Sequence, residues 1–438
     1  MEATPGDVNK FVDIPETIVW PGNGEVTIYD SATVTDYEDF SGLDFYNGQL
    51  YVVDNGTATF WALDVAEDGT LSYADGYENG KRVYFKKDAG DSDAAGPDAE
   101  GITVDSNGYV YLAVERDNSY KKVNYNVILM VDPSEDSTEL VATQEWDLTS
   151  VLPDVTANYG LEAVEFVASD EVNGLLYDTN TGDVFDISNY PDTVADGVFF
   201  TALEDNGHVY AFVLNSDGSY ALIADIDSQM GSAMALEYDE YESVLWVVTD
   251  GAVGCTCAQV TFNGTEDVDM VFIKPASGLD SSKNYEGFAI ADASYTVDGN
   301  RPVYYIEDGV TSGALAVGSI YCDYAETTLQ GTVYYQVNTS GTAVRFVAEI
   351  SSDDAMNADS GKIVATAKNT SGATATITSD VTTVYTSVKA NGKTVYASDG
   401  CYFIVSKTFK LTSDITEIKT AFSLNLYDNP LTRTVSFN

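Results

Sequence analysis

The chain has 438 residues, of which 44% are apolar and 12% aromatic, so it can bury a sizeable core. Its 20 basic and 70 acidic residues give a formal net charge of −50, which excludes binding to nucleic acid through the phosphate backbone because like charges repel. No apolar run approaches the length of a membrane span, so we expect no membrane-spanning segment.

The same charge suits a protein that stays soluble outside the cell. The opening residues, 1–6, have neither the basic nor the apolar region of a secretion signal. We therefore expect Met1 to be an added start on a mature secreted chain, and we expect the protein to be extracellular or on the cell surface.

A unit of two short strands recurs along residues 36–322. Its first half is a polar or acidic residue, then Gly or Ala, an apolar residue, any residue and another apolar one. Its second half is an apolar strand that ends in acidic residues, often with glycine. Copies of the first half are Ser41–Phe45, Glu100–Val104, Glu162–Phe166, Met234–Tyr238 and Glu286–Ile290. Copies of the second half are Leu50–Gly56, Val110–Glu115, Leu245–Gly251 and Val303–Gly309.

The long gap between Glu162 and Met234 has room for one more unit, which we assign to the strands 198–203 and 208–214. This makes six units, and six units of short strands predict an all-β fold, a six-bladed β-propeller, because the repeats of a β-helix are much shorter. The last unit offers three strands before Asp323. We expect residues 25–30 to supply the fourth strand and close the ring.

Charge divides the chain into two predicted domains. Residues 329–438 hold nine basic and nine acidic residues. Residues 1–328 therefore hold the other 11 basic and 61 acidic residues, which give them a net charge of 11 − 61 = −50. We therefore predict a strongly acidic propeller over residues 1–328. Residues 329–438 contain about eight alternating strands and a hairpin signal at 391–392, which predict an immunoglobulin-like β-sandwich. Its expected role is spacing, attachment or binding.

The small number of histidines and cysteines limits which catalytic and metal sites they can form. A histidine-rich zinc site is impossible with the single His208, and a Ser-His-Asp triad lacks its nucleophile elbow. Four cysteines allow three disulfide connectivities, and the sequence does not choose between them. Buried free thiols are the simpler expectation. The cysteines are Cys255, Cys257, Cys322 and Cys401.

Carboxylates are the chemical groups that the repeat supplies in quantity. Glu100, Glu162 and Glu286 occupy one equivalent position, and symmetry would bring them together around the propeller axis. Several carboxylates near one axis repel one another unless a cation compensates, so they form a candidate Ca²⁺ or Mg²⁺ site. The alternative is that these acids accept backbone N–H bonds from the next blade. The same candidate metal site includes the acids that end the second strand in four of the units: Asp54, Glu115, Asp250 and Asp308.

The segments 98–102, 160–164 and 284–288 resemble the Glu-Gly-Leu/Ile blade openings of phytase-like propellers, a group often labelled "esterase-like activity of phytase", and of SdiA-regulated and SMP-30-type six-bladed propellers. The resemblance covers roughly residues 36–322. It implies a secreted or surface protein that is a metal-dependent phosphoesterase or esterase. Ser41 and Met234 depart from it, because they stand where the family pattern has Glu. Basic residues that could hold a polyphosphate are also scarce.

Two functions follow from these observations. The first is a secreted hydrolase that depends on a divalent cation, with Ca²⁺ held by the channel carboxylates. The second is a non-catalytic surface protein that recognises glycan or protein through the propeller face. Loop aromatics could stack on sugars, although packing between blades is the alternative role for them. These aromatics are Tyr73, Tyr77, Tyr120, Tyr159 and Tyr285.

Overall fold

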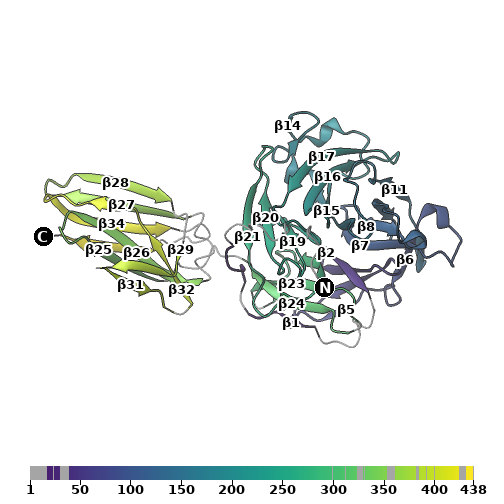
Figure 1. Ribbon diagram of the computed structural model, residues 1–438, viewed down its shortest axis with the longest axis horizontal. Coiled ribbons are helices and arrows are strands. Elements are labelled where there is room, and N and C mark those ends of the chain that lie inside the picture. The colour runs from purple at the N-terminus through teal and green to yellow at the C-terminus, as the bar shows by residue number, and fades with distance from the viewer. Residues whose placement is uncertain are drawn as a thin grey trace. The chain divides into compact units, whose positions relative to one another are not determined.

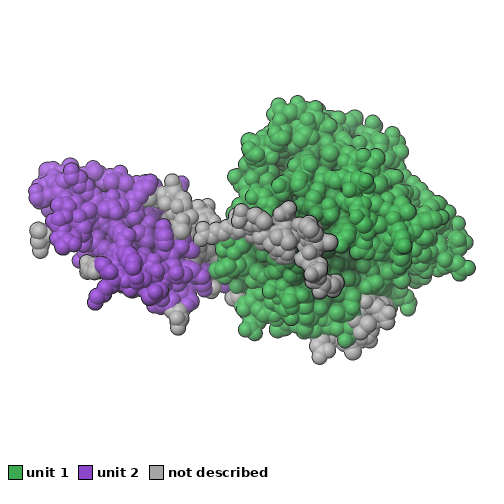
Figure 2. Space-filling model, viewed as in Figure 1, with its two compact units in different colours: residues 1–320 green, residues 321–438 purple. Residues whose placement is uncertain are grey.

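A computed structural model gives the fold as two compact units, residues 1–320 and 321–438 (Figure 2). The boundary lies slightly before the predicted one between residues 328 and 329. No helix among the described residues is long and apolar enough to cross a membrane. The structure describes residues 17–22, 24–29, 39–297, 299–310, 312–322, 329, 331–352, 361–380, 384–390, 392–398, 400–423 and 431–437.

The first unit contains five sheets of at least four strands within its described residues, and we call them blades I to V (Figure 1). Blade I consists of β2 (Phe40–Tyr46), β3 (Gln49–Asp54), β4 (Thr59–Val65), β5 (Leu71–Tyr73), β6 (Lys81–Tyr84) and β10 (Glu139–Val141). Blade II consists of β7 (Pro97–Val104), β8 (Val110–Asp117), β9 (Val127–Val131) and β11 (Gln144–Asp147). Blade III consists of β12 (Leu161–Ala168), β15 (Gly197–Leu203), β16 (His208–Leu214) and β17 (Tyr220–Asp227).

Blades IV and V complete the set. Blade IV consists of β18 (Ala235–Asp239), β19 (Val244–Val248), β20 (Cys257–Thr261) and β21 (Asp269–Ile273). Blade V consists of β22 (Tyr285–Ile290), β23 (Asn300–Glu307), β24 (Leu315–Tyr321) and β1 (Thr27–Ile28). The short elements between strands are β13 (Tyr177–Asp178), β14 (Asp183–Val184), α1 (Ser169–Val172) and the 3₁₀ turns Lys86–Asp88, Asn118–Tyr120 and Ile187–Asn189.

The five blades form a closed ring. The first strand of each blade contacts the first strand of the next in the order β2, β7, β12, β18, β22, and β22 contacts β2 again. Five apolar clusters lie between the blades, and each takes its side chains from two neighbouring sheets. A strand that is covered on both faces in this way consists of consecutive apolar residues. An example is Val244–Val248, which is buried throughout. The predicted propeller architecture is therefore present.

The predicted closing strand is confirmed, because β1 pairs antiparallel with β24. The prediction of six blades is wrong for the described residues. The strands 198–203 and 208–214 were assigned to a blade of their own, but β15 pairs with β12 and β16 pairs with β15. The long connection between β12 and β15 holds α1 and the small hairpin of β13 and β14, so the extra sequence length is an insertion inside blade III.

The second unit is a β-sandwich, because side chains of two sheets share one apolar core. The predicted hairpin is confirmed, with Val388 opposite Val395. One sheet contains β25 (Gly331–Val337), β26 (Ala343–Ser351), β29 (Val384–Tyr385), β32 (Cys401–Val405) and β33 (Phe409–Lys410). The other contains β27 (Lys362–Asn369), β28 (Thr374–Asp380), β34 (Ile415–Ser423) and β35 (Leu431–Ser436). The hairpin is β30 (Ser387–Ala390) with β31 (Lys393–Tyr396).

None of the four cysteines is part of a disulfide. Cys255 and Cys257 are buried, as expected, and they belong to the apolar cluster between blades IV and V. Burial raises the pKa of Cys255 to about 12, so this thiol stays protonated and unreactive at neutral pH.

Candidate functional site

The innermost strand of each blade presents two positions of the repeat to the ring axis. We number the repeat from its first residue, so position 1 is Ser41, Glu100, Glu162, Met234 and Glu286, and position 4 is Asp44, Thr103, Glu165, Glu237 and Ala289. In a regular strand, residues three apart point to opposite faces. A register irregularity at or beside position 1 occurs in β2, β7, β12 and β22. Such a bulge changes the phase of the strand, so positions 1 and 4 can face the same channel.

Close approach of the backbones narrows the channel between these two positions. A β-carbon added to Gly101 would lie 2.7 Å from the Cα of Ala163, and one on Gly287 would lie 2.3 Å from the carbonyl oxygen of Ser41. Only glycine fits at position 2 in blades II and V for this reason, whereas Ala163 and Ala235 occupy position 2 in blades III and IV. The cavity volume at the constriction is about 10 Å³, which is at the lower limit for holding one water molecule. The channel therefore has two separate ends.

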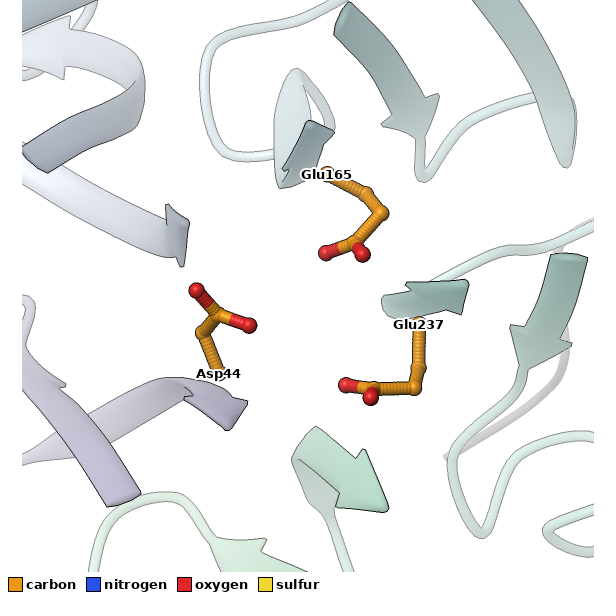
Figure 3. Close-up of side chains that lie close together, drawn as sticks. All are labelled: Asp44, Glu165 and Glu237. Carbon is orange, nitrogen blue, oxygen red and sulfur yellow. The ribbon is translucent and has the colours of Figure 1, made fainter. Parts of the chain in front are cut away.

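Position 4 faces a cavity of about 710 Å³, and we call this side the cavity end. Asp44, Glu165 and Glu237 come from blades I, III and IV and point toward a common centre (Figure 3). One carboxylate oxygen of each lies within 4.8 Å of the others, and all three residues are buried. The size of the cavity is in the range of small-molecule sites.

Backbone groups of the neighbouring blades orient these three carboxylates. Each accepts a hydrogen bond from a main-chain N–H at position 5 of the next innermost strand. Acceptance of N–H bonds from the next blade, which was the alternative to a metal site, therefore occurs at position 4. It also occurs at Glu115, whose Oε2 accepts from Gly160 N of the next blade at 3.3 Å. The bonds at position 4 run from Val104 N to Asp44 Oδ2 (2.8 Å), from Tyr238 N to Glu165 Oε1 (3.0 Å) and from Ile290 N to Glu237.

The remaining oxygens of two of these carboxylates have no partner. Glu165 Oε2 and Glu237 Oε2 are both buried and accept no hydrogen bond within the described part of the chain. A buried polar atom without a partner is costly, so it marks a place where a ligand, water or proton is to be expected. The two free oxygens therefore face a binding site.

Burial also changes the acidity of the cluster. It raises the pKa of Asp44 to about 7, although the Val104 N–H opposes this effect. Burial, and then the negative charge of a neighbour, raises the pKa of Glu165 and of Glu237 well above the usual range. Three carboxyl groups this close cannot all ionise, so at neutral pH they share protons. The site can therefore supply an acid and a base together.

A buried ion pair forms part of the cavity wall. Arg301, which is 2% exposed, donates from Nη1 and Nη2 to the two carboxylate oxygens of Asp239 at 2.7 and 2.6 Å. The pair joins β23 of blade V to β18 of blade IV, two residues beyond Glu237. Among the described lining residues, Arg301 is the one basic side chain, and this pair already neutralises it.

Position 1 forms the other side of the channel, which we call the tight end. Glu100, Glu162 and Glu286 lie together there, with one oxygen of each within 4.8 Å of the others. The prediction that these three residues meet at the axis is therefore confirmed. Desolvation raises the pKa of all three well above the usual range. The charge of Glu286 adds to the effect at Glu100, the charge of Glu100 adds to it at Glu162, and the charge of Asp308 adds to it at Glu286.

The second predicted set of acids is divided by the structure. Glu115 lies with Asp98 and Glu100, and Arg116 forms ion pairs with Glu115 and Asp98. Asp308 is close enough to Glu286 to raise its pKa.

The other two acids of that set accept hydrogen bonds in turns. Asp54 Oδ1 accepts from Thr57 N at 2.9 Å, and Asp250 Oδ1 accepts from Ala252 N at 3.0 Å. Neither belongs to a carboxylate cluster of the described residues. His208 also lies outside these clusters, with Nδ1 2.6 Å from Asp225 Oδ1.

Three of the five tyrosines considered for sugar stacking pack instead within the protein. Tyr285 is buried in the cluster between blades IV and V, and Tyr73 and Tyr77 pack against other clusters. Tyr120 and Tyr159 are exposed. Packing was the alternative role given for these residues, and it holds for Tyr285, Tyr73 and Tyr77.

The sequence interpretation missed the acids of the cavity end. Position 4 was treated as a variable residue of the repeat. Three of its five occupants are acidic, and a fourth, Thr103, accepts a hydrogen bond from Phe166 N. Recurrence of acids at that position was the signal available.

Comparison with protein families and with curated proteins finds no match for this chain. Solved structures of low similarity include the periplasmic gluconolactonase PpgL of Pseudomonas aeruginosa, at 11% identity and a TM-score of 0.27 over 92% of this chain and 96% of that one. Others are the GH43 protein BlXynB of Bacillus licheniformis (7%, TM-score 0.36, 92% and 90%) and an exo-inulinase of Aspergillus awamori (8%, TM-score 0.35, 94% and 94%). Similarities this remote carry no argument about the reaction.

Proposed function

We propose that this protein is a secreted or cell-surface hydrolase that cleaves an uncharged, hydroxyl-rich substrate, such as a glycoside, at the cavity end. The observation that carries the proposal is the group of three buried carboxylates from three blades beneath a cavity of about 710 Å³. Two of them, Glu165 and Glu237, direct a free oxygen into the site. Paired carboxyl groups that differ in protonation are the catalytic groups of most glycoside hydrolases.

Acidity and hydrogen bonding suggest how the roles divide. The pKa of Asp44 is raised by burial to about 7, whereas those of Glu165 and Glu237 are raised well above the usual range, so Asp44 ionises most readily and serves as base or nucleophile. Glu165 and Glu237 each keep one oxygen without a partner, so a protonated carboxyl there can donate to the leaving oxygen. Oxygens within 4.8 Å of one another match the short separation typical of retaining enzymes, about 5–5.5 Å. Retention of anomeric configuration is the expected outcome.

The lining of the cavity favours an uncharged substrate. Glu171, Glu240 and Asp292 add negative charge to the wall, while the Arg301 guanidinium is already paired. A phosphate ester or a uronic acid would therefore be repelled. Tyr46 and Tyr241 also line the cavity, and a sugar ring can stack on such aromatic rings, although the Arg301 guanidinium already lies over one face of Tyr241, 5.0 Å from the ring centre.

A Ca²⁺-dependent phosphoesterase of phytase-like type is the second candidate. The convergence of Glu100, Glu162 and Glu286 favours it, because a cation bound there could hold a phosphoryl oxygen. The position of the described cavity at the opposite end of the channel favours the first proposal. We also propose that the sandwich unit is an immunoglobulin-like attachment module, since its charge is neutral and none of the described carboxylate clusters lies in it.

The test is a substrate panel with the full chain, using nitrophenyl glycosides of neutral sugars, nitrophenyl phosphate and phytate, each with EDTA and with calcium. We expect release of nitrophenol from at least one neutral glycoside, and we expect it to continue in EDTA. Turnover of phosphate esters that requires calcium would support the second candidate instead. Binding of neutral oligosaccharides in calorimetry without any turnover would identify a glycan-binding protein and overturn the hydrolase.

A further inference from the structure

The tight end lies on the other side of the constriction from the cavity of about 710 Å³. Glu100 and Glu162 are 4% and 5% exposed, and Glu286 is half-buried. The constriction closes the channel on one side of them, with about 10 Å³ of free space. A space of this size suits an ion better than an organic molecule.

Two of the three glutamates accept a hydrogen bond from a neutral asparagine side chain. The amide of Asn55 donates to Glu100 Oε2 at 3.1 Å, and the amide of Asn284 donates to Glu286 Oε1 at 2.8 Å. Glu162 is different, because it accepts no hydrogen bond in the described structure. Glu162 as a whole residue is 5% exposed, and a carboxylate in such surroundings with no protein donor requires another compensating group.

No lysine or arginine of the described residues supplies that group. Arg116 is the nearest basic side chain along the strand that follows Glu100, and it already pairs with Asp98 and Glu115. None of the ion pairs in the described part of the chain includes Glu100, Glu162 or Glu286. Three carboxylates without a counter-charge are stable only if protons or a bound cation neutralise them.

We propose that Glu100, Glu162 and Glu286 bind one hard divalent cation, Ca²⁺, which joins blades II, III and V at the propeller axis. The donor set consists of oxygen atoms alone, which suits Ca²⁺. Oxygens that bind one Ca²⁺ at 2.3–2.6 Å lie within about 5 Å of each other, and the separation of up to 4.8 Å agrees with this. The role is structural and does not depend on the proposed hydrolase activity.

The experiment is calorimetric unfolding of the full chain after EDTA treatment and after back-titration with CaCl₂, for the unchanged protein and for Glu162→Gln. We expect calcium to raise the propeller Tm by several degrees in the unchanged protein, because a ligand that binds only the folded state stabilises it. Glu162→Gln should abolish that shift. The matched control is Glu165→Gln, three residues along the same strand at the cavity end, which should keep the shift.

Three results would overturn the proposal. A higher Tm of Glu162→Gln in EDTA, with no response of the unchanged protein to calcium, would mean that shared protons neutralise the cluster. Loss of the calcium shift in Glu165→Gln but not in Glu162→Gln would place the cation at the cavity end. Equal shifts in all three proteins would place it elsewhere. If Glu162→Gln does not fold, Glu286→Gln at the half-buried carboxylate gives the same readout.

Discussion

The two ends of the channel use the same five strands, and each has a group of three carboxylates at the axis, yet they are suited to different ligands. At the cavity end, Asp44, Glu165 and Glu237 are oriented by main-chain N–H groups and face a cavity of about 710 Å³. At the tight end, asparagine side chains orient two of the glutamates, and the constriction closes the space beneath them. Positions 1 and 4 are only three residues apart on each innermost strand, yet one set is arranged to bind an ion and the other to bind a substrate.

The difference shows that a carboxylate cluster does not define its own ligand. Main-chain donors are fixed by the fold, so they leave one oxygen of Glu165 and of Glu237 free toward the cavity without reorganisation. Side-chain donors such as Asn55 can move with the carboxylate that they hold. Preorganisation and space at one end favour catalysis, whereas enclosure at the other favours ion binding.

The largest effect is expected when the cavity end loses its acid. Glu237→Gln keeps the shape of the side chain but cannot donate or accept the proton, so kcat should fall by about 10²–10⁴-fold. Removal of one of three mutually repelling carboxyl groups should at the same time leave the Tm unchanged or slightly higher. The measurement is kcat on the best glycoside of the panel, together with the Tm.

The control is Glu139→Gln, an exposed glutamate on β10 that should retain full activity. A kcat for Glu237→Gln within twofold of the unchanged protein would contradict the assignment of catalysis to the cavity end. The comparison between the two ends would then lose its main functional distinction.

The second effect concerns the wall of the cavity. Arg301→Met removes the partner of Asp239 and leaves a charge buried between blades IV and V, which should cost about 3–5 kcal/mol of unfolding free energy. Replacing both residues, Arg301→Met with Asp239→Leu, should recover most of that loss because no unpaired charge remains. Urea unfolding of the propeller transition measures both variants.

The comparison variant is Lys283→Met, which breaks a partly exposed ion pair with Glu307. Exposed pairs contribute about 0–1 kcal/mol, so this loss should be much smaller. Equal losses from Lys283→Met and Arg301→Met would mean that the buried pair does not hold the wall together.

Much of this architecture could be predicted from the sequence. The repeat of small and apolar residues identified all five innermost strands, because each packs in an equivalent environment between two blades. The number of blades could not be obtained in that way, since the strands 198–203 have the composition of an inner strand but pair with β12 as the second strand of blade III. Pairing depends on residues distant in sequence, and local composition does not record it.

The site was predictable only at one end for a related reason. Glu100, Glu162 and Glu286 were found because each opens a copy of the repeat. Asp44 and Glu237 were not, because strict alternation excludes position 4 from the face that position 1 occupies. A bulge at position 1 turns the side chains of positions 1 and 4 toward the same channel. Its sequence signal is weak, and in blade I it is only Gly42 beside Ser41.

The smallest effect expected is on the pH dependence of stability, and it again separates the two ends. The pKa of Asp44 is about 7 in the folded protein, mainly because of burial, against an ordinary value of 3.8. A raised pKa means that the folded state binds more protons than the unfolded state between these two values. Stability from this group is therefore complete below about pH 4 and is lost as the pH rises through about 7.

In saturating calcium, which would occupy the tight end, the cavity end should dominate the remaining pH slope. Asp44→Asn should then flatten the decline in unfolding free energy between pH 5 and 7, because one proton contributes at most about 1.4 kcal/mol per pH unit. Asp64→Asn, an exposed carboxylate on β4 of the same blade, should leave the slope unchanged. Urea titrations at several pH values measure this slope. Glu165 and Glu237 share protons with Asp44. A steeper decline of the unfolding free energy in Asp44→Asn would therefore mean that the two glutamates, and not Asp44, hold the shared protons.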